Sequence, residues 1–190
     1  MLSQAGRETL VRAAVTADAA GVATIGLVAV PDTYAALCDP AVVRGIVEQS
    51  YAPRALEACI ERCAASADAH FLVAERGGRV AGFLHYDSDG REPELHRVYV
   101  EPGLKRHGVG TALLATLHEQ LDPGMSYVLM VVAANRPAVM FYARHGLVED
   151  ARVDGVAYLR EHAGIDFPQR TPPVPALVLR FTKPDEGSTA

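Results

Sequence analysis

The segment from Glu94 to Leu121, ELHRVYVEPGLKRHGVGTALLATLHEQL, joins a strand, a basic glycine turn and a helix in direct succession. Its first seven residues alternate as in a strand, and Pro102 ends the strand because proline has no N–H to donate. Gly108 and Gly110 have no Cβ, so a ligand can approach the backbone closely. Helical spacing of apolar residues follows, at Val109, Leu113, Leu114, Leu117 and Leu121. The turn is therefore predicted to bind an anion at a helix N-terminus, where free N–H groups and the helix dipole favour phosphate.

Two common phosphate-binding motifs do not fit this spacing. The dinucleotide fingerprint needs a third glycine where Leu113 stands, and an acidic residue after the next strand, MSYVLMVVAAN, which has none. A nucleotide P-loop that starts at Gly103 reaches Gly108 at the right distance. It then has Val109 and Gly110 in place of the required Lys and Ser/Thr, so this motif also fails.

The turn resembles the pyrophosphate turn of the GNAT superfamily of N-acetyltransferases, in which V-x-P is followed by R/Q-x-x-G-x-G/A and a leucine-rich helix. Lys105 stands at the Arg/Gln position, a mild departure because this family holds the pyrophosphate chiefly through backbone N–H groups. A second signature of the superfamily, N-x-x-A-x-x-F-Y-x-x-x-G-[FL], is matched at Asn135, Ala138, Phe141, Tyr142, Gly146 and Leu147. With both signatures in the family's order, the chain is identified as a member of this superfamily.

The resemblance implies the GNAT acyl-CoA N-acyltransferase fold. This is an α/β (α+β) fold with a mixed, mostly antiparallel central sheet and helices on both faces. It also implies that acetyl-CoA is the cosubstrate and lies along the strand and the glycine turn. The coenzyme-binding residues expected on this basis are Val98, Tyr99, Val100, Lys105, Arg106, His107, Gly108, Val109, Gly110, Thr111, Asn135 and Tyr142.

Acetyl transfer to an amine needs a base for the ammonium proton, donors for the oxyanion and an acid for the departing thiolate. Tyr142 matches the tyrosine that usually acts as general acid in this family, and a phenol of pKa about 10 is protonated at neutral pH. Glu94 and His96 share one face of the strand, at positions where the superfamily commonly places a catalytic Glu or His. Either is able to act as the base, and the sequence leaves that choice open.

The remaining segments fit a single domain, residues 6–183, followed by a flexible tail, residues 184–190. Further strands are predicted in LVRAAV (10–15), a hairpin HFLVAERGGRVAGFLHYD (70–87) that turns at its two glycines, residues 127–132, ARVDGVAYLR (151–160) and ALVLRFTK (176–183). Helices are predicted from residue 16 to the proline at 31, from about 41, and over 54–65, with an irregular segment over 31–40.

Composition limits the partners and the compartment. The chain has 190 residues, is 49% hydrophobic and 22% charged, and can bury one sizeable core. A net charge of −5 and a pI near 5.8 argue against nucleic acid as a partner. The longest apolar stretch, residues 21–30, is far shorter than the roughly 20 residues that cross a bilayer, and no signal peptide opens the chain. We therefore expect a cytoplasmic protein without a membrane partner.

No metal is expected, because Cys38, Cys59 and Cys63 show neither metal-ligand spacing nor a nearby ligand histidine. The cysteines are predicted to be small buried thiols. His85 is expected to face the strand of His96 across a hairpin. Acidic and tyrosine residues of two variable loops are further candidates for receiving an amine: Asp32, Tyr34, Asp39, Tyr51, Glu161 and Asp166.

The hypothesis from the sequence is an N-acetyltransferase that moves the acetyl group of acetyl-CoA to a primary amine of a small molecule, polyamine-like or other. Transfer is expected to be direct, in a ternary complex. The alternatives are a protein or peptide N-acetyltransferase and a non-catalytic module that binds acyl-CoA. The acceptor, the acyl chain length and the choice between monomer and homodimer remain open.

Overall fold

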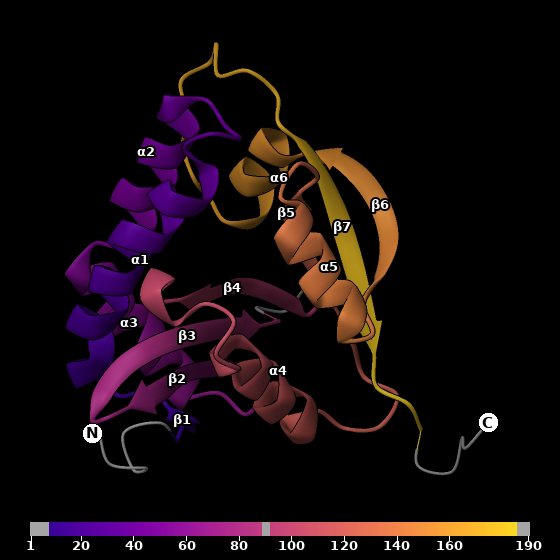
Figure 1. Cartoon of the computed structure of the whole chain (residues 1–190). Coiled ribbons are helices and arrows are strands. Elements are labelled where there is room, and N and C mark those ends of the chain that lie inside the picture. Colours follow the sequence, from indigo (N-terminus) through magenta and orange to yellow (C-terminus); the bar gives the residue numbers. More distant parts are fainter. Residues whose placement is uncertain (1–7, 89–91, 186–190) are drawn as a thin grey trace.

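A computed structural model describes residues 8–88 and 92–185 as one seven-stranded sheet with helices on both faces (Figure 1). The strand order is β1-β2-β3-β4-β5-β7-β6. All neighbours in the sheet are antiparallel except β4 and β5, which are parallel. The strands are β1 (Leu10–Ala13), β2 (His70–Arg76), β3 (Arg79–Asp87), β4 (Glu94–Val100), β5 (Ser126–Val132), β6 (Val148–Asp154) and β7 (Pro175–Thr182). The predicted mixed, mostly antiparallel sheet is confirmed.

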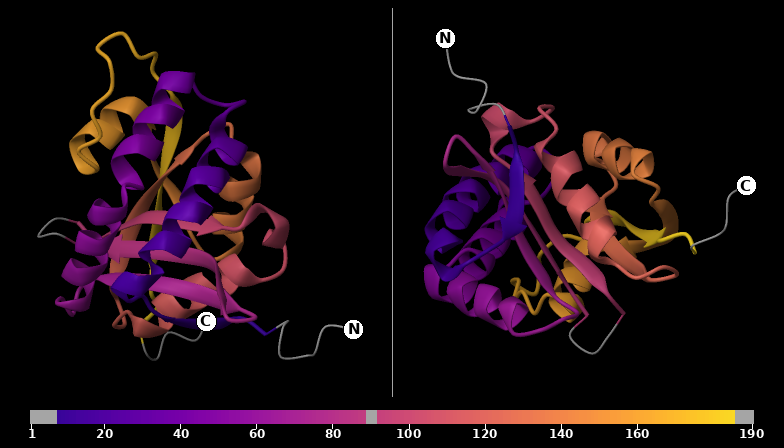
Figure 2. Two further views of the ribbon diagram at one scale, coloured as in Figure 1. Left: turned by 90° about the vertical axis from the view of Figure 1, so that its left-hand side faces the viewer. Right: turned by 90° about the horizontal axis from the view of Figure 1, so that it is seen from below.

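Helices cover the two faces of the sheet as separate layers (Figure 2). They are α1 (Ala19–Tyr34), α2 (Pro40–Ser50), α3 (Pro53–Ala64), α4 (Val109–Gln120), α5 (Arg136–Arg144) and α6 (Gly155–His162). Neighbouring residues of β2 point to opposite faces of the sheet and belong to two different hydrophobic cores. Leu72 packs with Leu113 and Leu117 of α4, whereas Phe71 packs with Leu56 of α3. One face of the sheet thus carries α4 and α5, and the other carries α1 and α3.

The hairpin of β2 and β3 turns where the sequence predicts. Gly77 and Gly78 have φ angles of +59° and +75°, and glycine adopts this left-handed region without a Cβ clash. The predicted strand at the start of the chain and the helices near 41 and 54–65 are also present, as β1, α2 and α3.

Two predicted elements are wrong. The segment 151–160 is not one strand, because β6 ends at Asp154 and α6 begins at Gly155. The Asp154 carboxylate accepts a hydrogen bond from the Val156 N–H at 3.0 Å and so caps the new helix. The expected break at Pro31 is also absent, since α1 continues to Tyr34. A proline in the last helical turn removes only one N–H donor, and its own carbonyl still accepts from Ala35 N at 2.9 Å.

The predicted start of the domain at residue 6 and most of the predicted tail lie outside the described residues. Among residues 8–88 and 92–185, no helix combines the length and the apolar character needed to cross a membrane.

Candidate functional site

The sheet opens between its two central strands. β4 and β5 share a single register pair, Glu94 with Val128, and the Val128 N–H donates to Pro93 O at 2.9 Å. Away from this pair the two strands diverge, while β4 stays paired with β3 and β5 stays paired with β7 on their outer sides (Figure 1). An opening of this kind leaves strand edges that can pair with an extended ligand.

The glycine turn, residues 105–110, lies where β4 leads into α4. Gly108 caps α4 with a φ of +82°, and nothing lies within 4 Å of the position of a Cβ on it. Glycine is therefore needed here for its backbone conformation and not for space. At Gly110 a Cβ would lie 3.3 Å from the Phe141 ring, so this glycine allows α5 to pack closely. The first N–H groups of α4, from Val109 onward, have no partner within the helix and are available to an anion.

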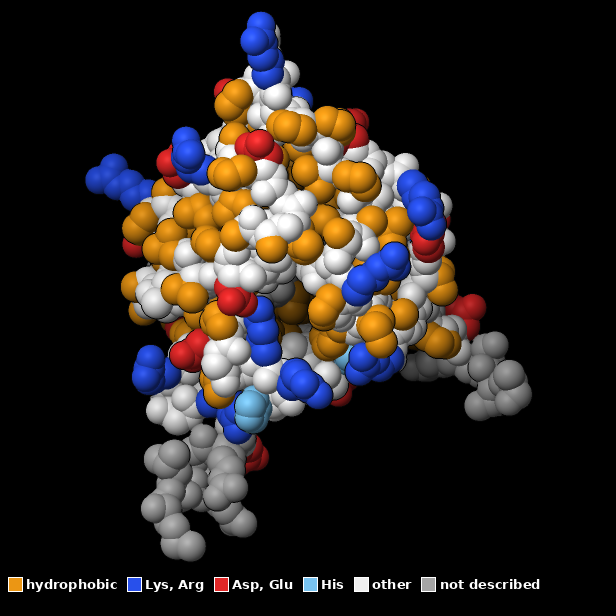
Figure 3. Space-filling view, turned by 45° about the horizontal axis from the view of Figure 1, so that its top comes forward, with side chains coloured by type: hydrophobic (Ala, Val, Ile, Leu, Met, Phe, Trp, Pro, Cys, Tyr) orange, Lys and Arg blue, Asp and Glu red, His pale blue; other side chains and the backbone are white. Residues whose placement is uncertain are grey.

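The Lys105 side chain points across the turn to α1. Its Nζ pairs with the Asp32 carboxylate, and both side chains are about half exposed. His107 Nδ1 lies 3.0 Å from the Lys105 carbonyl. Lys and Arg side chains gather below a hollow in the face seen in Figure 3. The lysine side chain is thus already paired, which leaves the backbone N–H groups as the main anion contacts that the turn offers.

On the other side of β4 lies a cavity of about 850 Å³, called here the polar cavity. It is lined by residues of α1, α2, α3, β3, β4, β5, α6 and β7. Its charged lining residues are Arg62, Asp87, Glu92, Glu94, Arg97 and Glu161. Carboxylates therefore outnumber guanidinium groups in its wall, and a cationic group is favoured inside it.

Glu94 and His96 lie together in this cavity, as their shared strand face predicts. Glu94 is only 8% exposed, and its Oε1 lies 3.8 Å from His96 Nδ1 and its Oε2 3.5 Å from His162 Nδ1. Asp87 accepts hydrogen bonds from His96 Nε2 and His85 Nε2, each at 2.9 Å. Burial would raise the pKa of Asp87, but the hydrogen bonds from His85 and then His96 outweigh it and hold that pKa well below its usual range.

The two imidazoles are stacked, with ring centroids 4.9 Å apart, so His85 faces the strand of His96 as expected. With Nε2 of His96 held by Asp87, its Nδ1 is the nitrogen that is able to take a proton. The arrangement places one imidazole and one buried carboxylate side by side.

A bulge in β4 changes which residues share a face. His85 pairs with Arg97 and Tyr86 with Leu95, so His96 is an additional residue without a partner in β3. The strict alternation expected from sequence, with Arg97 on the face of Leu95, is therefore wrong beyond His96. The residues of β4 that line the polar cavity are Glu94, His96, Arg97 and Tyr99, whereas Leu95, Val98 and Val100 pack toward α4.

Tyr142 lies on the face of the sheet that carries α4. It is half buried against Phe141, with ring centroids 5.3 Å apart, and does not line the polar cavity. Burial, and next the neighbouring Tyr34, raise the pKa of Tyr142, so the phenol keeps its proton at neutral pH. Asn135 caps α5, since its Oδ1 accepts from the Ala138 N–H at 3.3 Å. The structure thus separates the candidate acid from the candidate bases by the strand β4.

The candidate amine-binding residues of the variable loops divide into two groups. Tyr34, Tyr51 and Glu161 line the polar cavity. The other three have different contacts: Asp32 pairs with Lys105, Asp39 caps α2 through Ala41 N, and Asp166 binds Gln49 through its backbone.

Sequence reasoning missed Cys59, Asp87, Arg97, Tyr158 and His162, which also line the polar cavity. Asp87 carried a signal, because it follows His85 by two residues at the end of the same strand. Arg97 reaches the cavity through the bulge in β4, and the other three depend on the packing of α3 and α6 against the sheet, which no local pattern reveals.

A model of the family described as an acetyltransferase (GNAT) domain matches residues 67–149. This part of the chain is a domain of the GNAT superfamily. The matched part of the GNAT domain runs from just before β2 to the start of β6 and contains the opening, the glycine turn and α5. Recognition of this superfamily from two sequence signatures is confirmed.

Two curated relatives match the same part of the chain. Mycothiol acetyltransferase of Clavibacter sepedonicus is 35% identical over 97 residues, which is 47% of this chain and 29% of that protein. An uncharacterized N-acetyltransferase of Methanocaldococcus jannaschii is 34% identical over 94 residues, which is 45% of this chain and 42% of that protein. The chain spans less than half the length of the curated relatives it matches.

Solved structures resemble almost the whole chain. PaiA N-acetyltransferase from Thermoplasma acidophilum, solved in complex with coenzyme A, superimposes with a TM-score of 0.73 at 18% identity. That match covers 92% of this chain and 99% of the other. YncA, a putative acetyltransferase from Salmonella typhimurium solved with acetyl-CoA, gives a TM-score of 0.69 at 17% identity, covering 96% and 98%. These matches confirm the predicted GNAT fold.

Proposed function

We propose that the chain is an acetyl-CoA-dependent N-acetyltransferase that acetylates a primary amine of a small molecule by direct transfer in a ternary complex. One domain, residues 6–183, would carry the activity, and the three free thiols fit a reducing cytoplasm. Membership of the superfamily and the acetyl-CoA and coenzyme A complexes of its structural neighbours support acetyl-CoA as the cosubstrate.

The observation that carries the proposal is the position of the opening between two different surfaces. On one side the glycine turn presents the free N–H groups of α4 from Val109 onward, and on the other the polar cavity presents Glu94 and His96. The β4 edge between them offers backbone groups near Val98 and Val100. A thioester bound along this edge would have its phosphates at the helix and its acyl carbon beside the carboxylate.

Each chemical role falls to a group with suitable properties. Glu94 is a buried carboxylate that attracts an ammonium group, and it or His96 removes the proton before attack. Backbone N–H groups of β4 face the carbonyl oxygen as charge develops on it. Tyr142, which stays protonated, gives a proton to the departing sulfur.

The excess of carboxylates in the polar cavity favours an amine over an anionic acceptor. An amine of pKa about 10 enters as ammonium and must lose its proton, and a carboxylate helps with both steps. The cavity is also large enough, at about 850 Å³, to hold a whole small molecule, because ligand pockets usually measure about 300–1,000 Å³.

The test is the release of coenzyme A thiol from acetyl-CoA with a panel of polyamines, arylalkylamines, amino acids and short peptides. Wild type is compared with Tyr142→Phe, and Tyr86→Phe in the core serves as the matched control. We expect release that depends on one class of amine. The rate should fall about 100-fold in Tyr142→Phe, because general acid catalysis typically contributes that much or more, and stay near wild type in Tyr86→Phe.

Release of coenzyme A only in the presence of peptides would indicate a protein or peptide acceptor instead of a small molecule. Binding of acetyl-CoA in calorimetry without release for any amine would favour a non-catalytic acyl-CoA-binding module. Absence of acetyl-CoA binding would overturn the proposal as a whole.

A further inference from the structure

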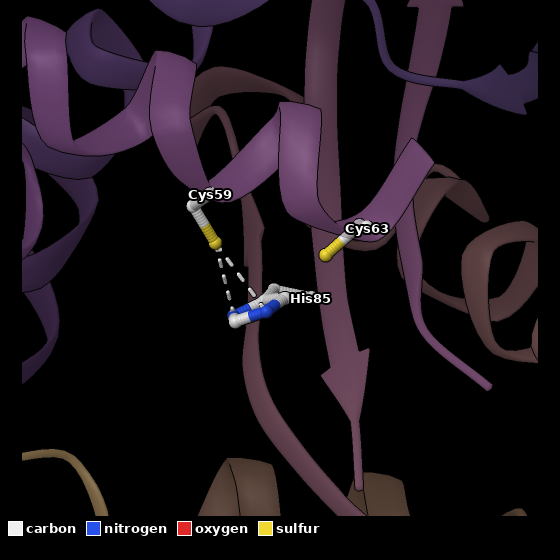
Figure 4. A group of neighbouring side chains, drawn as sticks. All are labelled: Cys59, Cys63 and His85. Carbon is white, nitrogen blue, oxygen red and sulfur yellow. Dashed lines mark hydrogen bonds between the residues drawn. The ribbon is translucent and has the colours of Figure 1, made fainter. Parts of the chain in front are cut away.

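Two cysteines and a histidine form a compact group beside the polar cavity (Figure 4), and two of them, Cys59 and His85, line the cavity itself. Cys59 and Cys63 lie one turn apart on α3, and His85 reaches them from β3. Cys59 Sγ lies 3.4 Å from His85 Nε2 and 3.9 Å from Nδ1. The sequence predicts small buried thiols without a nearby histidine; Cys59 and Cys63 are buried, but the predicted absence of a histidine is wrong.

A zinc ion is one candidate occupant, because the ligand atoms of the three residues lie within 4.8 Å of one another. Zinc bonds of about 2.3 Å to sulfur and 2.0 Å to nitrogen would place S and N about 3.6 Å apart, close to the distance found. The proton positions decide against zinc. The Arg97 guanidinium donates to His85 Nδ1 at 3.1 Å, so the proton of the neutral ring lies on Nε2, which donates to Asp87 at 2.9 Å. Zinc at Nε2 would break the contact with Asp87 and zinc at Nδ1 the contact with Arg97, so both ring nitrogens are already engaged.

Arg97 instead supplies the positive charge that a thiolate needs. Its Nη2 lies 3.6 Å from Cys59 Sγ, and its Nη1 donates to Ser50 O at 3.0 Å. The guanidinium also lies over the rings of Tyr51 and Phe71, at 5.8 and 5.9 Å. This cation is therefore held beside the sulfur by contacts on several sides, and a second, divalent cation would be repelled.

The titratable groups in contact with Cys59 all lower the pKa of its thiol. A hydrogen bond from Cys63 lowers the pKa of the Cys59 thiol most, burial opposes this, and His85 and Arg97 lower it further. The same contact with Cys59, together with burial and the Asp87 charge, raises the pKa of Cys63, although Arg62 opposes this. One sulfur of the pair is thus the anion and the other the hydrogen-bond donor.

We propose that Cys59 is a modification site, a thiolate in the polar cavity that reacts with small peroxides and forms a disulfide with Cys63. The Cys59 sulfur attacks a peroxide oxygen, the O–O bond breaks, and the leaving oxygen takes a proton to become water or an alcohol. The Cys63 sulfur then attacks the sulfenic acid, the S–O bond breaks, and the proton of Cys63 leaves with the hydroxyl as water. The peroxide is reduced and the thiol pair is oxidised.

The positions of both cysteines suit this chemistry. Cys59 is only 4% exposed but lines the polar cavity, which admits small molecules. Residues four apart on a helix have Cα atoms about 6 Å apart, within the roughly 4.4–6.8 Å that a disulfide spans, but their Cβ atoms, about 5–6 Å apart, must approach to about 4 Å. Cys63 is followed by the last residue of α3, Ala64, so the final turn can adjust when the bond forms. The proposal concerns thiol chemistry and does not depend on acetyl transfer.

Cys38 is the internal control, because it is more exposed than Cys59, yet burial raises the pKa of its thiol. The wild-type protein, treated with a chelator, is exposed to limiting hydrogen peroxide at pH 7, and mass spectrometry follows each cysteine. We expect Cys59 to be consumed at least tenfold faster than Cys38. The product should be a Cys59–Cys63 disulfide that dithiothreitol reverses.

Two variants separate the steps. Cys63→Ser should trap the sulfenic acid on Cys59 as a dimedone adduct, whereas Cys59→Ser should leave Cys63 unreactive. A measurement on the unmutated protein keeps the test independent of folding defects. Between pH 8 and 6 the iodoacetamide rate of Cys59 should change less than twofold, while that of Cys38 falls about tenfold per pH unit, as a thiol does below its pKa.

Equal or faster reaction of Cys38 would overturn the proposal, as would an alkylation rate of Cys59 that falls with pH as steeply as that of Cys38. Zinc that copurifies with the untreated protein and protects Cys59 until it is chelated would also overturn it. None of these results depends on coenzyme binding or amine acetylation, so a failure here is distinguishable from a failure of the proposed function.

Discussion

The glycine turn and the polar cavity lie on opposite sides of β4 and are built from different parts of the chain. The turn is one contiguous segment, and its chemistry comes from backbone N–H groups oriented by the φ angle of Gly108. The cavity is built from side chains of eight helices and strands, such as Cys59 of α3, Glu94 of β4 and His162 of α6. A backbone site depends on conformation, whereas a side-chain site depends on the identity of each group.

This difference has a consequence for substitution. At the turn, a changed side chain should matter little and a changed backbone conformation should matter much. In the cavity the reverse should hold, since isosteric substitutions keep the shape but remove the charge or the proton acceptor. The following variants test that contrast, and those that concern activity rest on the proposed acetyl transfer.

The largest effect is expected in the cavity, from Glu94→Gln. The amide keeps the shape of the side chain but neither attracts an ammonium group nor accepts its proton. We expect kcat to fall about 100-fold or more, the typical contribution of a general base, with little change in the KM for acetyl-CoA. Steady-state kinetics with the amine found in the panel would measure this, with Glu119→Gln on the exposed face of α4 as the control.

His96→Gln completes this test. If His96 is the base and Glu94 only attracts the ammonium group, the histidine variant will lose more kcat and will lose the acid limb of the pH–rate profile. Asp87 is not responsible for that limb, because its lowered pKa keeps it ionised throughout the assay range. Wild-type kcat in both variants would show that neither Glu94 nor His96 is the base.

The next effect is expected at the turn, from Gly108→Ala. No atom would contact the new Cβ, but a φ of +82° costs a non-glycine residue about 1–2 kcal/mol, so the N–H groups should reorient. We expect the KM for acetyl-CoA to rise about 5- to 30-fold while the KM for the amine is unchanged. Gly103→Ala is the matched control, because Gly103 is equally uncrowded and has no positive φ. Equal effects of the two substitutions would contradict the backbone argument.

A smaller, pH-dependent effect distinguishes the imidazoles on the two sides. His85 and His96 face a carboxylate, whereas His118 on α4 stacks on Phe181 at 3.8 Å and bonds Tyr127 Oη at 2.9 Å. Burial, then His145 and Lys183, lower the pKa of His118 to about 4. Between that value and about 6.5 the unfolded chain binds more protons than the native one. The free energy of unfolding is therefore highest above pH 6.5 and decreases as the pH is lowered.

His118→Gln should remove roughly 1–2 kcal/mol of this acid destabilisation, a value reduced for its partial exposure. Urea unfolding at pH 7.5 and pH 5 measures it as the difference between the two pH values, which cancels the lost ring contact. His107→Gln at the exposed glycine turn is the control. An unchanged pH dependence in His118→Gln would show that this imidazole is charged in the native state.

The smallest effect is expected for the Lys105 side chain. It already pairs with Asp32 at the surface, and pairs of this kind contribute about 0–1 kcal/mol. Lys105→Ala should therefore change the KM for acetyl-CoA less than about fivefold. Asp32→Asn, which breaks the same pair but keeps the cation, is the control. A tenfold rise in the lysine variant alone would mean that the side chain, and not only the backbone, binds the coenzyme.

Much of the fold was accessible from local patterns. The strand, turn and helix of residues 94–121, the Gly77-Gly78 hairpin and the cap at Asn135 all follow from residues within a few positions of one another. The two errors have the same local origin. A proline near the end of a helical run has the same local pattern whether it ends the helix or lies in its last turn, and the run around Asp154 alternates like a strand although its carboxylate caps α6.

The sequence by itself determined the superfamily, the sheet with its helices and the position of the glycine turn, because φ preferences, caps and hydrophobic spacing act between near neighbours. Only the tertiary structure decided the composition of the polar cavity. The bulge at His96 moved Arg97 to the face of Glu94, and α3 brought Cys59 to His85, 26 positions away. Such contacts arise from the packing of whole elements and the local break in strand pairing, and neither leaves a periodic signal in the chain.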